Sequence, residues 1–307
     1  MCRLAGVLHD QGKLAEAGGL YRETLEATRE VLGARHPNTL ASMNNLALVL
    51  RDQGKLLEAE ELLRHACSAS CEMFGEDHPQ SLRSKAGLGS ILHDLGRLYQ
   101  SETFIREALT VERQTLGERH PDTLTSVRCL AVVPQAQRRL VEGEALLTTT
   151  VAATHKVLGE RLPALLMCKC NQASCLLALG KVDEAFSLST ATLETMGSCL
   201  GERHPSTLRM QGVLADVLRA RRRLDKAWHM VLASLEVLWQ VRQERHVWIL
   251  EHRTVRAHIA MLIHGPNVGE GAETVEDVVH DMRLTLGMDH FLTRRFEAVS
   301  QEFAACG

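Results

Sequence analysis

Aromatic residues make up only 4% of this sequence, although hydrophobic residues as a whole make up 45%. The core must therefore be built from aliphatic side chains and alanine, which suits closely packed helix pairs. No apolar run approaches the roughly 18 residues that a membrane-spanning helix needs. No secretory leader is recognisable after Met1 either. We therefore expect a soluble chain that is not held in a membrane.

An excess of charge of one sign is also lacking, because 35 basic residues face 38 acidic ones and the net charge is −3. Such a balance gives no general attraction to nucleic acid or to anionic membranes. The nine cysteines are odd in number and do not lie in a loop-rich disulfide framework. We expect a cytoplasmic protein with reduced thiols.

Catalytic and metal-binding motifs are missing as well. The sequence has no glycine-rich phosphate loop, no Gly-x-Ser-x-Gly turn and no His-Glu-x-x-His helix. The thiols of Cys168, Cys170 and Cys175 fall short of the four ligands of a structural zinc site, and we interpret them as small buried residues. The sequence therefore predicts no enzyme activity, no cofactor and no metal site.

What the sequence does contain is a phrase that recurs every 42 residues. It reads Leu-Gly-Ala-Arg-His-Pro-Asn-Thr-Leu from Leu32 to Leu40, and its His-Pro step returns at 78–79, 120–121 and 204–205. Repetition at a fixed period of this size is typical of a solenoid of stacked supersecondary units.

Two apolar stripes within each period, spaced by threes and fours, predict two helices. In the second period they are Leu40, Met43, Leu46, Ala47 and Leu50, then Leu56, Ala59, Leu62, Leu63 and Ala66. Gly54 is expected to end the first helix in a left-handed conformation. The proline of each phrase is expected to start the next helix, with the histidine before it helping. We predict an all-α, right-handed superhelical solenoid of about six and a half antiparallel helix hairpins.

The prediction treats residues 1–307 as a single solenoid domain. Its units are 1–36, whose first helix is short, then 37–78, 79–120, 121–162, 163–204, 205–246, the degenerate unit 247–290, and a C-terminal capping helix in 291–307. The short first helix favours a chain that is part of a longer protein or is covered by an upstream segment. Pro134 predicts a kinked or shortened helix in the fourth unit. Arg138 and Arg222 replace the turn glycine, and the last turn becomes the glycine-rich stretch 265–271.

The first helix of each hairpin is expected to line the concave side of the array. On this concave side, the positions outside the apolar stripe recur in phase with Asn44 and Arg51. Arginines recur at these positions, and few acidic residues are expected to pair with them. Arginine can bind both oxygens of a carboxylate, and asparagine can pair with a peptide backbone. We predict a mildly basic groove for a protein or peptide partner, acidic or extended. Its residues are Asn44, Asn45, Leu48, Arg51, Arg83, His93, Arg128, Asn171, Arg209 and Arg219.

The phrase Leu-Gly-x-x-His-Pro-x-Thr-Leu is followed by Asn-Asn-Leu-Ala and by Gln-Gly-Lys-x-x-Glu-Ala-Glu. This combination resembles the long tetratricopeptide repeat (TPR) of the kinesin light chain and nephrocystin-like type. The resemblance covers nearly the whole chain and is sharpest from Leu32 to Pro121. It implies a TPR-like fold and a protein–protein interaction scaffold or adaptor.

The alternative implied by the resemblance is a cargo adaptor for microtubule motors, with a motor heavy chain as partner. In kinesin light chains, asparagines of successive first helices contact cargo peptides, and Asn44, Asn45 and Asn171 match that motif. The other equivalent positions carry different residues, namely Ala86-Gly87, Arg128-Cys129 and Gly212-Val213.

Overall fold

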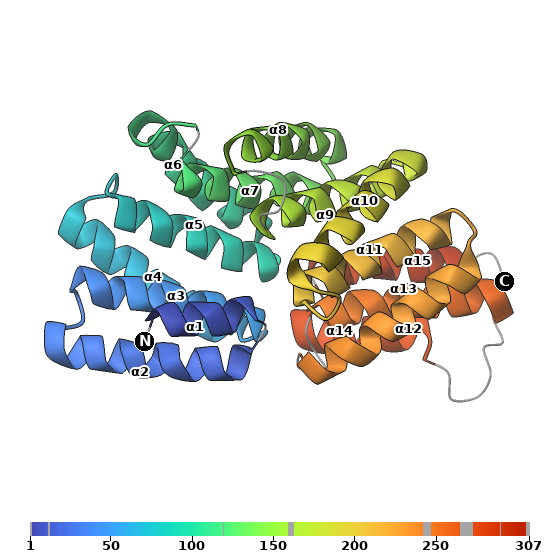
Figure 1. Ribbon diagram of the computed structural model, residues 1–307, viewed down its shortest axis with the longest axis horizontal. Helices are drawn as coiled ribbons and strands as arrows, with labels where there is room; N and C mark the ends of the chain where they lie inside the picture. The colour runs from blue at the N-terminus through green and yellow to red at the C-terminus, as the bar shows by residue number, and fades with distance from the viewer. Residues whose placement is uncertain are drawn as a thin grey trace. The chain divides into compact units, whose positions relative to one another are not determined.

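The computed structural model describes residues 2–11, 13–118, 120–158, 163–241, 247–264, 273–288 and 290–304. These residues form fifteen α-helices and no strand, which confirms the predicted all-α hairpin fold (Figure 1). Among them, no helix has both the length and the apolar character needed to cross a membrane. The helices are α1 (Cys2–Asp10), α2 (Leu14–Leu32), α3 (Pro37–Asp52), α4 (Leu56–Phe74), α5 (Pro79–Asp94), α6 (Leu98–Thr115), α7 (Pro121–Ala136), α8 (Leu140–Leu158), α9 (Pro163–Ala178), α10 (Val182–Leu200), α11 (Pro205–Ala220), α12 (Leu224–Val241), α13 (Val247–His264), α14 (Val275–Leu286) and α15 (Phe291–Ala304).

The chain divides into two compact units, residues 1–133 and 134–307, and the division falls within α7. Within each unit, helices that follow one another along the chain pack side by side. The first unit has its main core around Ala47, Ala59, Leu63 and Ile91. The second unit has a corresponding cluster around Ala215, Ala227, Val231 and Ile259. Small residues thus recur where neighbouring helices approach closely, as in the sequence pattern.

Several residues of the repeated phrase stabilise the start of a first helix. The His36 Nδ1 atom accepts a hydrogen bond from the backbone N–H of Asn38 at 3.2 Å, and Pro37 occupies the first helical position. The buried Thr39 hydroxyl donates to the carbonyl of Gly33 at 2.8 Å, which closes the loop. The same capping bond is made by His78, His120, His204 and His290. The predicted helix-starting role of these histidines is confirmed, whereas His246 lies outside the described residues.

The turn inside each hairpin has a fixed backbone geometry. Gly54 has a φ of +79°, and the bonds from Lys55 N to Leu50 O and from Gly54 N to Arg51 O measure 2.8 and 2.9 Å. This pair of hydrogen bonds is the Schellman motif, which requires a residue in the left-handed conformation. Gly96 and Gly180 have φ values of +76° and +77°. Arg138 and Arg222 keep the left-handed conformation, at 62° and 58°, at a cost of about 1–2 kcal/mol each.

Of the kink or shortening predicted at Pro134, the shortening is wrong and the kink stays a prediction. α7 has 16 residues, as many as α3 and α5, and it contains Pro134. Pro134 lies in the last turn of the helix, where its carbonyl accepts the capping bond from Arg139 N at 2.7 Å. Proline cannot donate to the carbonyl of Leu130, four residues earlier, yet the helix continues for two residues beyond Pro134. The predicted turn at 265–271 lies outside the described residues.

Candidate protein interaction surface

The first helices of the N-terminal unit join one another through buried polar contacts. Asn44, on α3, is buried, and its Nδ2 donates to the hydroxyl of Ser84 on α5 at 3.0 Å. The Ser84 hydroxyl also lies 3.2 Å from Asn44 Oδ1. Because the amide is occupied in this way, Asn44 fixes the spacing of α3 and α5 rather than presenting its amide to a ligand.

Arg51 forms an ion pair with the next repeat. Its Nε donates to an Asp94 carboxylate oxygen at 2.5 Å, and His93 lies 3.0 Å from the other oxygen. Burial alone would raise the pKa of Asp94, but the charge of Arg51 and the hydrogen bond from His93 hold it well below its usual range. The charge of Asp94 in turn raises the pKa of Arg51 against the opposing effect of burial. Arg51 is thus neutralised within the protein.

The same contact exists one repeat earlier. His9 Nε2 lies 2.8 Å from an Asp52 carboxylate oxygen. In both cases the last residue but one of a first helix meets the last residue of the following first helix, 43 residues further along the chain. These two pairs form a ladder that sets the register of α1, α3 and α5, and we call it the inter-repeat ladder.

Other predicted residues of this unit remain on the surface. Leu48 is 43% exposed although it is a large apolar side chain, and Asn45 beside it is partly exposed. Arg83 is exposed and pairs with Asp122 at 3.2 Å. The buried Nε of Arg128 has no hydrogen-bond partner in the described part of the chain. The expectation that few acids oppose the arginines is therefore wrong for Arg51 and Arg83.

The predicted residues of the C-terminal unit are arranged differently. Asn171, on α9, is buried, and its Oδ1 accepts a hydrogen bond from Arg209 of α11 at 3.1 Å. The Arg209 guanidinium also lies over the Trp248 ring, 5.4 Å from its centroid. Arg219 pairs with Asp216 of its own helix at 2.7 Å. Each of these cations has an internal partner.

The sequence pattern does not show which groups hold the predicted residues in place, namely Ser84, Asp94, Asp122, Asp216 and Trp248. Asp52 and Asp94 recur 42 residues apart, and that recurrence could have revealed the ladder. The position of Trp248 carries no comparable signal.

The thiols of α9 show no arrangement of ligands. Cys168, Cys170 and Cys175 are buried, and burial raises the pKa of Cys175 to about 11. Among the described residues, no group of three or more His, Cys, Asp or Glu side chains could hold a metal ion.

Comparison with protein families agrees with this architecture. Two models described as tetratricopeptide repeat match the chain, one at residues 1–72 and 164–238 and the other at 81–122. These ranges cover more than half of the chain, so the protein belongs to the tetratricopeptide repeat family. Its repeats are of the kinesin light chain type. The search of curated proteins found no match.

Solved structures give the same result. A Podosopora anserina protein described as a kinesin light chain with nearly identical TPR-like repeats is 26% identical, with a TM-score of 0.52 over 67% of this chain and 97% of that one. BtubC (BKLC) from P. vanneervenii is 17% identical, with a TM-score of 0.56 over 74% and 91%. A Rap protein complexed with competence and sporulation factor is 10% identical, with a TM-score of 0.61 over 99% and 98%. The last two show likeness of fold alone.

Proposed function

We propose that this protein is a non-enzymatic scaffold or adaptor that binds a peptide or a protein through the exposed residues of its first helices. The observation that carries the proposal is Leu48. This large apolar side chain is 43% exposed on α3, between residues that polar contacts hold in place. An exposed apolar side chain on a rigid polar surface suits the anchor of an interface.

The chemistry of the proposed partner follows from the other polar residues of the first helices. Arg51 already neutralises Asp94, so a carboxylate from a partner would have to compete with a partly buried internal one. Arg83 pairs only at the surface, and Arg128 has a buried Nε without a partner among the described residues. The preference for acidic groups in the proposed partner therefore rests on Arg83 and Arg128, while Asn45 is available to an extended backbone. We place this activity in the cytoplasm and assign it neither nucleic acid nor membrane as a partner.

A second candidate is a kinesin light chain-like cargo adaptor. It is favoured by the 26% identity to the kinesin light chain repeats of Podosopora anserina. It predicts that the full chain is co-purified with a kinesin heavy chain from cells. If a heavy chain fails to co-purify under conditions that retain other partners, the scaffold function stands without the motor.

The decisive test compares two exposed leucines of one hairpin. Leu48 lies on the first helix, and Leu57, which is 68% exposed, lies on the second helix. We expect Leu48→Asp to weaken the binding of affinity-purified partners at least tenfold and Leu57→Asp to leave it unchanged. Both variants should unfold at the wild-type temperature, because neither leucine is buried. Loss of binding only in Leu57→Asp would assign the interface to the second helices.

A further inference from the structure

One pair of cysteines is placed so that the two thiols can act together. Among the nine cysteines, only Cys67 and Cys71 are separated by three or four residues, and both lie on α4. Side chains four residues apart share one face of a helix. Burial, together with the charge and the hydrogen bond of the neighbouring Cys71, raises the pKa of the Cys67 thiol to about 12. Cys67 is buried and Cys71 is partly exposed, so the pair can be reached from solvent through Cys71.

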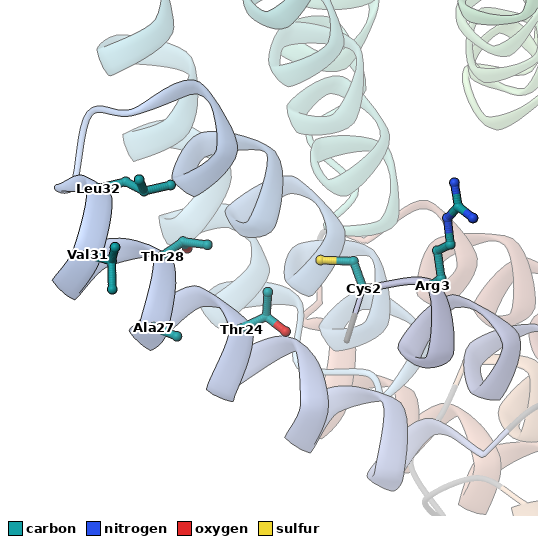
Figure 2. Close-up of a pocket in the computed structure, with 7 residues that line it drawn as sticks. All are labelled: Cys2, Arg3, Thr24, Ala27, Thr28, Val31 and Leu32. Carbon is teal, nitrogen blue, oxygen red and sulfur yellow. The ribbon is translucent and has the colours of Figure 1, made fainter.

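The exposed thiol of Cys2, in the same unit, is placed differently. It lies with Arg3 at the beginning of α1, beside a cavity of about 630 Å³ (Figure 2). The other residues that line this cavity come from α2 and are Thr24, Ala27, Thr28, Val31 and Leu32. Cys2 therefore offers a soft ion a single ligand there, whereas Cys67 and Cys71 offer two.

A buried ammonium group lies beside the pair on α4. Lys85, on α5, is only 7% exposed, which is rare for a lysine. Its Nζ lies 3.0 Å from Glu76 and 3.7 Å from Glu107, and both of these carboxylate side chains are more than half exposed. Lys85 is also close enough to Cys67 and Cys71 for their charges to interact. The fixed charge next to the two thiols is therefore positive.

The neighbouring repeats have apolar residues at the positions of Cys67 and Lys85. The counterparts 42 residues earlier and 42 residues later each belong to one apolar cluster, and they are Leu25 with Met43 and Leu109 with Val127. A thiol and an ammonium group thus replace a contact between two apolar side chains. Burying an ammonium group costs more free energy than burying an aliphatic side chain. Packing alone therefore does not account for this pair.

We propose that Cys67 and Cys71 form a binding site for one copper(I) ion, with Lys85 as the charge that balances the complex. Thiolates are the ligands that select soft ions such as copper(I). Both thiols release their protons to solvent as two S–Cu bonds form, and copper stays in the +1 state throughout. The resulting complex carries one net negative charge, which the ammonium group of Lys85 offsets. The site is separate from the exposed residues of the first helices and does not depend on the proposed function.

The geometry of the helix favours a bridging ion over a disulfide. Cβ atoms four residues apart on a helix are about 5–6 Å apart, whereas a disulfide needs them at about 3.5–4.5 Å. An ion between the two sulfur atoms adds two metal–sulfur bonds, each about 2.3 Å long as in zinc sites, and spans the wider gap without unwinding α4. A structural zinc site takes four ligands. The expectation of no metal site was based on that number, and a site with two ligands differs from it.

The test measures how tightly the full, reduced chain holds copper(I) without oxygen, in competition with a colorimetric copper(I) chelator. We expect the wild type to retain one ion per chain, and Cys67→Leu and Cys71→Ser each to hold it at least a hundredfold more weakly. Cys67→Leu introduces the residue of the neighbouring repeats, so this variant should fold. Cys2→Ser removes an exposed thiol of the same unit and is the matched control, which should bind like the wild type.

The role of Lys85 has its own pair of variants. Lys85→Met introduces the residue found one repeat earlier and should weaken the binding of copper(I) at least tenfold, whereas Lys85→Arg keeps the charge and should bind within threefold of the wild type. Unchanged binding in Lys85→Met would overturn the role assigned to this residue.

X-ray absorption of the loaded wild type should show two sulfur ligands at copper. The proposed site is overturned if the wild type retains no ion against the chelator, or if Cys67→Leu and Cys71→Ser retain it as tightly as the wild type. An equal loss in Cys2→Ser would also overturn it, because binding would then be shared among the thiols of the chain.

Discussion

The two units build the same hairpins but join their first helices by different polar contacts. In the N-terminal unit, His9–Asp52 and Arg51–Asp94 repeat one contact at one spacing. In the C-terminal unit, the position of Asp94 is occupied by Ala178 and Ala220, and Arg219 pairs within its own helix. A contact that recurs in phase holds successive repeats in one register. In the C-terminal unit, α9 and α11 are joined by a contact of another kind, the hydrogen bond from Arg209 to Asn171.

The hairpin turns of the N-terminal unit are also more regular than those of the C-terminal unit. The N-terminal unit has Gly54 and Gly96 at its left-handed turn positions, whereas the C-terminal unit has Arg138 and Arg222 at two of its own. Glycine adopts this conformation without strain, and arginine does not. The regular half of the protein is therefore also the half with unstrained turns.

The largest expected effect comes from removing one carboxylate of the ladder. We expect Asp94→Ala to lower the free energy of unfolding by about 2–3 kcal/mol, because it leaves the half-buried Arg51 without its partner. Asp216→Ala in the C-terminal unit should cost less than about 1 kcal/mol, because it removes a pair within one helix. Urea unfolding of the two variants measures the difference. The double change Arg51→Leu with Asp94→Leu should recover most of the loss, and equal costs for Asp94→Ala and Asp216→Ala would remove the distinction between the units.

The two units should also differ in their stability at acidic pH. Burial lowers the pKa of His258, in the C-terminal unit, to about 4, and the cations of Arg219 and Arg295 add to the effect while Asp216 opposes it. The unfolded state then binds a proton more readily than the folded state, so stability is present above pH 6.5 and is lost between pH 6.5 and about 4. The loss amounts to at most about 3 kcal/mol. Asp94, with a lowered pKa, stabilises the N-terminal unit until the pH falls below about 4.

Hydrogen exchange followed by mass spectrometry tests this order. Peptides from α11 and α13 should lose protection at pH 5, while those from α3 and α5 keep theirs. His258→Gln cannot take up the proton and should flatten the response of the C-terminal unit. A response that is unchanged in His258→Gln would assign the acid sensitivity to another group.

The smallest stability effect concerns the turns. Arg222→Gly should stabilise the chain by about 0.5–1 kcal/mol, because relief of the left-handed strain exceeds the entropy that glycine adds to the unfolded state. The reverse change, Gly180→Arg, should destabilise it by a similar amount. Thermal unfolding of both variants and their combination checks the sign. A stabilising Gly180→Arg would contradict the strain argument.

The sequence was sufficient for the helices, because each end is marked by local chemistry. His36 and Pro37 start a helix and Gly54 ends it, and these marks recur at one period. The shortening that Pro134 predicts does not occur, because the proline lies only two residues before the end of α7 and costs the helix a single hydrogen bond. The single-domain organisation stays a prediction.

The candidate surface was less predictable. The in-phase positions lie on first helices, but the period alone does not show which of them are already bonded within the protein. Asn44 meets Ser84, and Asn171 meets Arg209, across distances of about 40 residues in the chain. Such contacts depend on how closely two helices approach, and a period gives only their order. The use of Leu48 and Arg83 in binding stays a prediction.

The most direct measurement is photo-crosslinking in cells from a benzophenone side chain placed at position 48 or at position 57. Both sites are exposed and belong to one hairpin, so the two proteins differ only in the helix that carries the probe. The proposed function predicts that position 48 captures a discrete protein partner and that position 57 does not. Capture of the same partner from position 57, with none from position 48, would contradict the assignment of the binding surface to the first helices.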